Sequence, residues 1–204
     1  MKYYFLLAFS TLLLFSCGKD DKISVRTKVN FGSDWTFTKD STSLSWEKIT
    51  LPHTAQIEPL VVNNQWQGDC WYQKKFDVES VENEKVFLYF EGVMHEAWVW
   101  INGKFVTHHQ GGYLPFTVDA TDFVQAKENT IIVKVNNEDN PQIPPGKTLK
   151  TLDFNYYGGI YRNVYLIKTN PVYITDAVHA NQINGGGILV HFDKISKDKA
   201  SGIV

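Results

Sequence analysis

The chain has 204 residues, and its 20 lysines and arginines nearly balance its 22 aspartates and glutamates, for a formal net charge of −2 at pH 7. This length allows one β domain with a proper core and a further fragment. A mildly acidic chain with scattered charges offers no basic surface for nucleic acid, so that class of partner is excluded.

The first segment is an apolar run over residues 3–15, preceded by Met1 and Lys2. The run is too short to span a bilayer, but it has the length of a signal-peptide core. Its end, Leu14-Phe15-Ser16-Cys17, resembles a bacterial lipobox, in which a small residue precedes the cysteine.

We therefore expect a lipoprotein signal peptide over residues 1–16, a lipidated N-terminus at Cys17 and a charged tether over residues 17–28. The expected location is the bacterial cell envelope, where the lipid anchors the chain to a membrane on its periplasmic or surface-exposed side. The alternative is an ordinary cleaved signal with an incidental cysteine. If Cys17 is lipidated, Cys70 remains the one other cysteine, and no intrachain disulfide can form.

Short runs rich in β-branched and aromatic residues, bounded by Gly, Pro and Asn, then fill the chain and predict an all-β fold. Both faces of the run at residues 85–90 are apolar, so we expect this strand to be buried on both sides. The expected strands cover residues 35–37, 46–51, 71–78, 85–90, 97–101, 104–106, 129–136, 160–167, 172–180 and 188–192, and residues 194–204 are expected to fray.

Two local signals give more detail. Asn102-Gly103 lies between two alternating runs, which predicts a type I′ hairpin. After residues 117–118, Asp119 or Thr121 is expected to cap one helical turn.

The histidines suggest no catalytic or metal centre. His53 follows Pro52, where a structural hydrogen bond is a more common role than that of a base. His108 and His109 are adjacent on an expected strand, so they face opposite sides and cannot easily share an ion. We expect no metal and no cofactor.

Residues 58–68 form an expected loop rich in amide side chains. Asn63, Asn64 and their glutamine neighbours offer donors and acceptors together, which suits a ligand made of hydroxyls, and Trp66 offers a stacking face. The same composition fits a loop that satisfies itself through Asx turns.

A second expected loop, residues 137–149, contains three prolines and leads into Asp153. Loops of this length in a compact domain are usually functional or disordered, and we expect this one to form the rim of a site, with Asp139 and Asn140 as lesser candidates.

Asp153 itself opens an acidic, aromatic loop that ends at Gly158-Gly159, immediately before an expected strand. The two glycines allow positive φ or a close approach by another backbone or a ligand. Asp153 and Tyr157 are therefore candidate ligand-binding residues. The alternative is a tight corner in which Asp153 caps backbone amides and the tyrosines pack.

This stretch resembles a signature of the sugar-binding domain of glycoside hydrolase family 2, which includes β-galactosidases and β-glucuronidases. In that family an acidic residue precedes a small-Gly-Ile/Leu-aromatic-Arg run by five positions, as Asp153 precedes Gly158 here. Further matches in family order are Leu51-Pro52-His53, the run at residues 71–78, and Asn102-Gly103 followed by Gly111-Gly112-Tyr113.

The resemblance implies a jelly-roll β-sandwich at residues 29–169, followed at residues 170–204 by the first strands of an immunoglobulin-like sandwich. It implies that Asp153, and by spacing Asn63 or Asn64, contact a terminal β-linked, galactose-like sugar. In the family both catalytic glutamates belong to a (β/α)₈ barrel, which is thus an expected partner. Nothing here reads as that barrel, so we expect no hydrolysis by this chain alone.

Three functions remain open on the sequence. The chain is part of a family 2 glycosidase whose barrel it assists, a stand-alone carbohydrate-binding lipoprotein in which Asn63, Trp66, Asp153 and Tyr157 form the site, or a structural remnant whose motifs serve packing.

Overall fold

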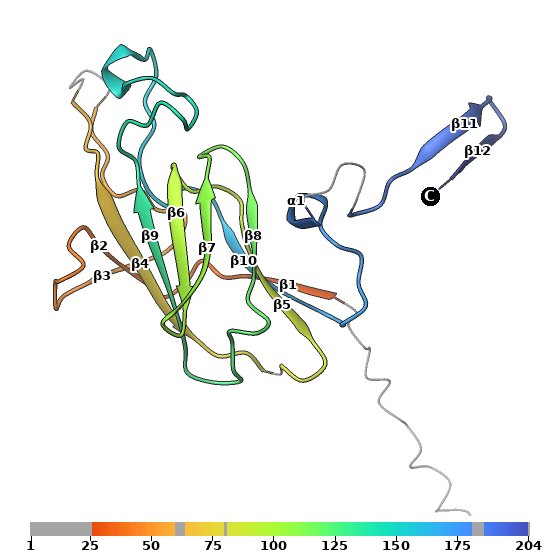
Figure 1. Ribbon diagram of the computed structural model, residues 1–204, viewed down its shortest axis with the longest axis horizontal. Coiled ribbons are helices and arrows are strands. Elements are labelled where there is room, and N and C mark those ends of the chain that lie inside the picture. Colours follow the sequence, from red (N-terminus) through yellow and green to blue (C-terminus); the bar gives the residue numbers. More distant parts are fainter. Residues whose placement is uncertain (1–25, 60–63, 80, 181–185, 204) are drawn as a thin grey trace, which may run out of the picture.

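The computed structural model describes residues 26–59, 64–79, 81–180 and 186–203. The described residues up to Thr169 form a β-sandwich of two antiparallel sheets (Figure 1), and the last two strands form a separate two-stranded sheet, which confirms the expected all-β class. One sheet has the order β1 (Arg26–Asn30), β10 (Val164–Thr169), β5 (Lys85–Phe90), β8 (Phe116–Asp119). The other has the order β3 (Glu47–Ile49), β2 (Trp35–Thr38), β4 (Asp69–Phe76), β9 (Asn129–Asn136), β6 (Glu96–Ile101), β7 (Lys104–Gln110). Residues 26–28, which the sequence assigned to a tether, lie in β1.

The core fills the space between the two sheets. Strands β4, β6 and β9 alternate between buried and half-buried side chains along their length, because successive side chains of a strand point to opposite faces. The inward set includes Trp35, Tyr72, Leu88, Phe90 and Val133, none of which exposes measurable surface. Burial of this apolar area is the main stabilising force, because Cys70 is a free, buried thiol and offers no cross-link.

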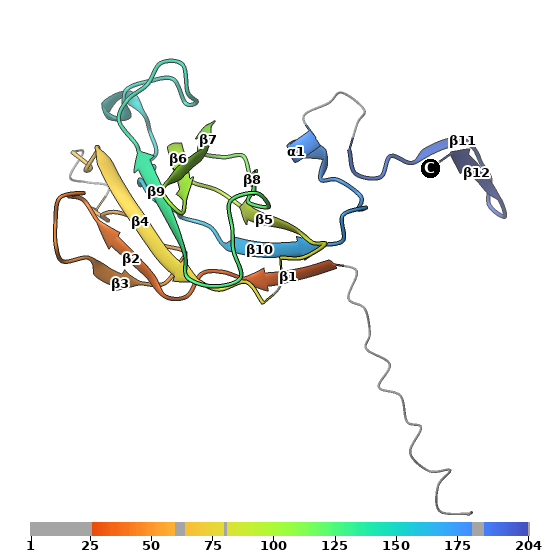
Figure 2. The ribbon, with the colours of Figure 1, turned by 60° about the horizontal axis from the view of Figure 1, so that its bottom comes forward.

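Strand β5 is buried on both faces, as its sequence predicted. Val86 and Leu88 point into the main core, whereas Phe87 points to the outer side and is still only 5% exposed. The outer side is covered by the segment that follows β10, since the Phe87 ring lies 5.4 Å from the ring of Tyr173. Figure 2 shows this segment turning back from β10 towards α1 (Ala177–Ala180).

The turn between β6 and β7 confirms the type I′ hairpin. Asn102 has φ 50° and Gly103 has φ 76°, the two positive values that this turn requires. Asn102 also accepts a hydrogen bond from the backbone N–H of Thr130 at 2.9 Å, which fixes the hairpin against β9. After β8, Asp119 Oδ1 accepts a 3.0 Å bond from the N–H of Thr121, as expected for the cap of that turn.

The strand expected at residues 160–167 begins later, at Val164. The reason is that the backbone before it bonds elsewhere: the carbonyl of Ile160 accepts from the N–H of His53 at 2.9 Å, and Gly159 forms an isolated bridge with Met94. Alternating side chains alone do not reveal this break.

The expectations for the last part of the chain were wrong in detail. Residues 172–180 are not a strand; they form a loop and the short helix α1, whose start is capped by Asp176 Oδ1, an acceptor from the N–H of His179 at 3.0 Å. The strand expected at 188–192 lies later, as β11 (His191–Ile195), and the fraying expected after residue 194 is not seen in the described residues up to 203, because β12 (Ala200–Ile203) pairs with β11. No helix in the described part of the chain is long and apolar enough to cross a membrane.

Candidate functional site

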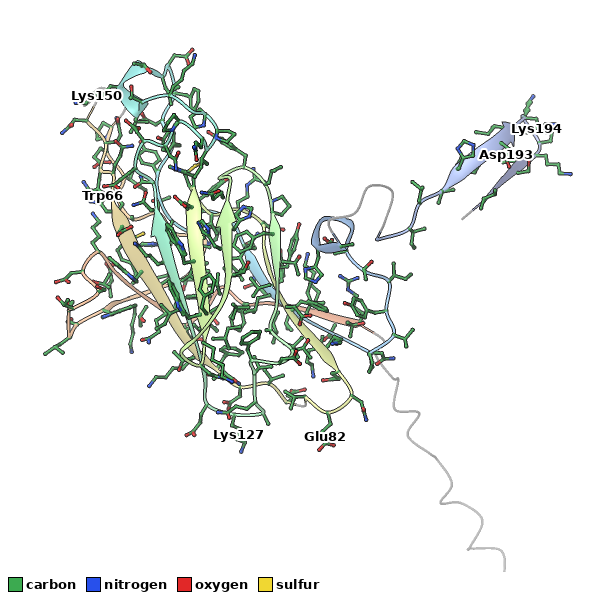
Figure 3. The ribbon with its side chains drawn as sticks, in the orientation of Figure 1. Trp66, Glu82, Lys127, Lys150, Asp193 and Lys194 are labelled. Carbon is green, nitrogen blue, oxygen red and sulfur yellow. The ribbon has the colours of Figure 1, made fainter. Side chains whose placement is uncertain are left out.

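The two loops expected to form a site meet at one end of the sandwich. Figure 3 labels Trp66 and Lys150 there, far from Lys127 and Glu82 at the opposite end. The Tyr157 hydroxyl donates a 2.6 Å hydrogen bond to the carbonyl of Glu58, which ties residues 153–160 to the loop that contains Trp66.

Asn137 holds the base of this end. Its side chain is fully buried, and its Oδ1 accepts from the N–H of Gly68 at 2.9 Å while its Nδ2 donates to the carbonyl of Trp66 at 3.1 Å. A Cβ atom added at Gly158 would lie 2.6 Å from Cγ of Asn137. The first glycine of the pair is therefore needed because the Asn137 side chain fills the space next to it.

Gly159 is constrained in two ways. Its φ is +132°, and an added Cβ would lie 2.5 Å from the Tyr72 hydroxyl and 2.8 Å from the carbonyl of His53. Both reasons given by the sequence for the double glycine, positive φ and close approach, are confirmed at this residue.

Asp139 is a brace of the loop and not a free ligand. Its Oδ1 accepts from Gln67 Nε2 at 2.8 Å, from the N–H of Leu149 at 2.9 Å and from the Tyr156 hydroxyl at 3.3 Å. Burial raises the pKa of Asp139, but these three hydrogen bonds outweigh it and lower the pKa below 3.8. Burial, helped by the Asp139 charge, raises the pKa of Tyr156 to about 12, so its hydroxyl stays a donor.

His95 lies beneath Tyr156. Its side chain is 2% exposed, its ring meets that of Tyr156 edge-on at 5.9 Å, and neither ring nitrogen has a hydrogen-bond partner among the described residues. Burial lowers the pKa of His95, although Glu96 and Asp139 act in the opposite direction. His95 is thus held as a neutral ring.

A hollow of about 600 Å³ opens at this end of the sandwich. That volume lies within the range of small-molecule sites, about 300–1,000 Å³. It is lined mainly by aromatic side chains with one charged group: Tyr113, Phe154, Asn155, Tyr157, Tyr161 and Arg162. Aromatic faces with a few polar groups suit the apolar C–H faces and the hydroxyls of a sugar.

Asp153 lies next to this hollow, since its neighbours Phe154 and Asn155 line it. The Asp153 side chain is exposed, and it forms no hydrogen bond or ion pair with the described residues. No such cap by Asp153 is therefore seen among the described residues, and its carboxylate is exposed.

Tyr157 also lines the hollow. The hydroxyl donates to the carbonyl of Glu58 and accepts from Asn155 Nδ2 at 3.2 Å. Tyr157 can therefore offer a stacking surface, while its polar atom is already used.

Trp66 differs from the expectation of a free stacking face. It is half-buried and packs against the main core, and Lys39 Nζ lies 4.6 Å from the centre of its ring. Asn64 is exposed, and Asn63 and Cys17 lie outside the described residues. Phe154, Tyr161 and Arg162 were not selected as site residues, although they flank Asp153 in the motif that marked it.

The other histidines have structural partners. His53 Nδ1 lies 3.0 Å from the Tyr72 hydroxyl, in agreement with its expected role. His108 Nε2 bonds Glu96 at 2.7 Å and His109 Nε2 bonds the carbonyl of Gly111 at 2.9 Å, so the two rings face different neighbours. No group of three or more His, Cys, Asp or Glu side chains within the described ranges could hold a metal ion.

Comparison with known proteins places this geometry in context. Residues 23–170 match the family described as "Glycosyl hydrolases family 2, sugar binding domain". A β-galactosidase of Thermoanaerobacter pseudethanolicus is 35% identical over 165 residues, which are 74% of this chain and 22% of the relative. A β-glucuronidase of Formosa agariphila is 33% identical over 87% of this chain and 20% of its own length.

Solved structures show the same relationship. A putative β-galactosidase from Bacteroides fragilis superposes with a TM-score of 0.69 at 30% identity, over 85% of this chain and 27% of that one. A β-glucuronidase described as a member of glycoside hydrolase family 2 superposes with a TM-score of 0.70 at 32% identity, over 85% and 21%. The chain therefore spans about a fifth to a quarter of the proteins that it matches.

Proposed function

The chain belongs to glycoside hydrolase family 2, as its sugar-binding domain, and from this we propose that Asp153 contacts the terminal sugar of a β-glycoside that a barrel domain of the same protein hydrolyses. The observation that carries the proposal is the Asp153 carboxylate, exposed and unpartnered among the described residues, next to an aromatic hollow of about 600 Å³. An ionised carboxylate accepts hydrogen bonds from hydroxyls, which is the chemistry that holds a sugar in one orientation.

The carboxylates of this domain indicate which part of the function it performs, sugar binding or bond cleavage. Retaining glycosidases need two carboxyl groups about 5–5.5 Å apart. The Asp139 carboxylate accepts from three donors and braces the loop. The Glu58 carboxylate accepts from the N–H of Trp66 at 3.0 Å. The hollow thus supplies sugar contacts, and the cleavage chemistry belongs to the barrel. The relatives named above are β-galactosidases and β-glucuronidases, so the proposed substrate is a terminal β-galactoside or β-glucuronide.

An activity assay of the purified chain tests whether bond cleavage needs the barrel. We expect no release of nitrophenol from nitrophenyl β-galactoside or nitrophenyl β-glucuronide at any pH from 5 to 8. Turnover that copurifies with the chain and is lost in Asp153→Asn would overturn it, because the chain would then contain the catalytic groups.

A stand-alone sugar-binding role is the second candidate, and the volume of the hollow is the observation in its favour. Titration of galactose and glucuronate into the purified chain separates the two. No binding up to high millimolar concentration at the residues that line the hollow is expected if the site needs the barrel, whereas millimolar affinity there would support the second candidate.

We also propose that Cys17 carries a lipid that anchors the protein in the bacterial cell envelope. The support is the sequence at residues 14–17 behind an apolar run. Metabolic labelling with a fatty acid tests it: label is expected in the wild type and absent in Cys17→Ser, and equal labelling of the two would contradict it.

A further inference from the structure

A short chain of hydrogen bonds leads into the hollow beside Asp153. The Tyr157 hydroxyl donates to the carbonyl of Glu58 at 2.6 Å, and Asn155 Nδ2 donates to the same hydroxyl oxygen at 3.2 Å. Both Asn155 and Tyr157 line the hollow of about 600 Å³. These bonds therefore connect a backbone carbonyl of one loop to an amide side chain that lines the hollow.

The order of donors and acceptors in these bonds fixes the orientation of the Asn155 amide. A hydroxyl has one proton, and a backbone carbonyl only accepts, so the proton of Tyr157 is used at Glu58. The hydroxyl oxygen of Tyr157 can then only accept from its other neighbour. The amide atom beside it must therefore be the nitrogen of Asn155 and not the oxygen.

One N–H and the carbonyl oxygen of the Asn155 side chain are left without a partner. An amide side chain has two N–H donors and one accepting oxygen. One N–H is used at Tyr157, and the side chain forms no other hydrogen bond with the described residues. Asn155 is half-buried and lines the hollow, so a ligand there can reach its amide. An oriented donor next to an acceptor matches a hydroxyl, which both donates and accepts.

Asp153 and Asn155 belong to the same short loop and differ in the hydrogen bonds that they can form. An ionised carboxylate only accepts, and that of Asp153 has no partner among the described residues. Asn155 supplies the donor that the carboxylate lacks. Tyr113 and Phe154 line the same hollow and offer apolar ring faces. A sugar ring with hydroxyls on neighbouring carbons suits two such polar side chains that are two residues apart.

We propose that Asn155 is a second contact to the terminal sugar, in which its amide bonds one hydroxyl, and that Tyr157 is a positioning residue that orients this amide. The inference rests on the proposed role of Asp153 in a glycosidase and adds a second residue to that site. The group bound by Asn155 is a hydroxyl and not a carboxylate, because an ionised carboxylate cannot donate to the amide oxygen.

Kinetics of the proposed glycosidase, this domain together with its barrel, test the contact. Asn155→Ala should lower kcat/KM about 3- to 10-fold, less than Asp153→Asn, because a neutral hydrogen bond contributes less than a bond to a charge. Gln125→Ala removes an exposed side-chain amide between β8 and β9 and should retain full activity. An unchanged kcat/KM in Asn155→Ala, together with a loss in Asp153→Asn, would overturn this inference alone. Unchanged values in both variants would overturn the proposed function as well.

Substrate analogues identify the hydroxyl that Asn155 bonds. The probes are nitrophenyl β-glycosides that each lack one hydroxyl of the terminal sugar. One of them should lose about 3- to 10-fold in kcat/KM with the wild type and nothing further with Asn155→Ala, because both changes remove the same hydrogen bond. Losses that multiply for every analogue would show that Asn155 acts through the fold, and would contradict the contact.

Tyr157→Phe tests the positioning role, because it keeps the ring and removes the hydroxyl that orients the amide. It should lower kcat/KM in the wild-type background and cause no further loss in Asn155→Ala. In the purified chain, the NMR signals of the Asn155 side-chain amide protons should shift in Tyr157→Phe. They should stay in place in Tyr161→Phe, which loses a bond to the carbonyl of Gly112 instead. Additive kinetic losses, or equal shifts in the two variants, would overturn the positioning role.

Discussion

The hydroxyl of Tyr156 donates a 3.3 Å hydrogen bond to Oδ1 of Asp139, and this contact joins the two loops that form the end of the sandwich. The same oxygen accepts from Gln67, which belongs to a third segment. One carboxylate therefore braces the loops beside the hollow, whereas Asp153 forms no hydrogen bond or ion pair with the described residues.

Tyr156→Phe should lower the free energy of unfolding by about 1 kcal/mol, which is less than the roughly 1.5–3 kcal/mol of a bond to a buried charged group, because Asp139 is largely exposed. Urea denaturation followed by fluorescence measures the change. Tyr161→Phe, which loses a 2.6 Å bond to the carbonyl of Gly112 but none to Asp139, is the comparison for loop coupling. Hydrogen exchange at Leu149 should rise in Tyr156→Phe only; equal protection in both variants would contradict the bracing role.

Asn137→Ala should cost about 2 kcal/mol of unfolding free energy, because it removes a fully buried amide and leaves the half-buried N–H of Gly68 and carbonyl of Trp66 without that partner. Asn64→Ala, at an exposed position in the preceding loop, should change stability by less than about 0.5 kcal/mol. Thermal and urea unfolding of the two variants measure the difference. Equal stability of Asn137→Ala and Asn64→Ala would mean that water takes over the hydrogen bonds of the Asn137 amide without loss of stability.

Stability should fall on acidification through the pH range below 6.5, in part because of His95. Its pKa is lower in the folded protein than the ordinary 6.5, so the unfolded chain binds more protons as the pH falls and is favoured. His53 and His109 have lowered pKa values as well and contribute in the same direction.

The contribution of His95 is isolated by His95→Phe. Both ring nitrogens are unpartnered, so the variant should be as stable as the wild type near pH 7.5 and lose less stability by pH 5. Urea midpoints at the two pH values measure it. Parallel loss in wild type and variant would show that His95 is not the group that titrates.

Gly159→Ala should destabilise the domain by more than about 2 kcal/mol, because it combines positive φ with a clash against Tyr72 and His53. Gly103→Ala is the matched control, since Gly103 also has positive φ but nothing lies within 4 Å of an added Cβ, and it should cost about 1–2 kcal/mol. Melting temperatures compare them. A smaller loss at Gly159 would mean that the neighbouring segments can move apart.

Much of the sandwich could be predicted from the sequence, because alternation of side chains is a local property. The β9 bounds and the Asn102-Gly103 turn agree with the sequence, and the apolar nature of both faces of β5 correctly indicated double burial. The late start of β10 could not be predicted, since it depends on hydrogen bonds from His53 and Met94, which are distant in sequence.

The candidate site, too, could be predicted only in part from the sequence. Asp153 and the double glycine stand out locally, and the structure explains the glycines by contacts with Asn137 and Tyr72 that no local pattern contains. Trp66 shows a similar limit: the sequence suggests a free stacking face, but the ammonium of Lys39 from another segment lies 4.6 Å from the centre of its ring.

The most direct test of the central claim is kcat/KM of Asp153→Asn in the proposed glycosidase, this domain together with its barrel, measured with the nitrophenyl β-glycoside that the wild type hydrolyses best. Loss of a charge-assisted bond to the sugar should lower kcat/KM about 10- to 150-fold, while the melting temperature stays unchanged because Asp153 is exposed and unpartnered among the described residues. Asp122→Asn, at an exposed acid in the turn after β8, should retain full activity. An unchanged kcat/KM in Asp153→Asn would contradict the account.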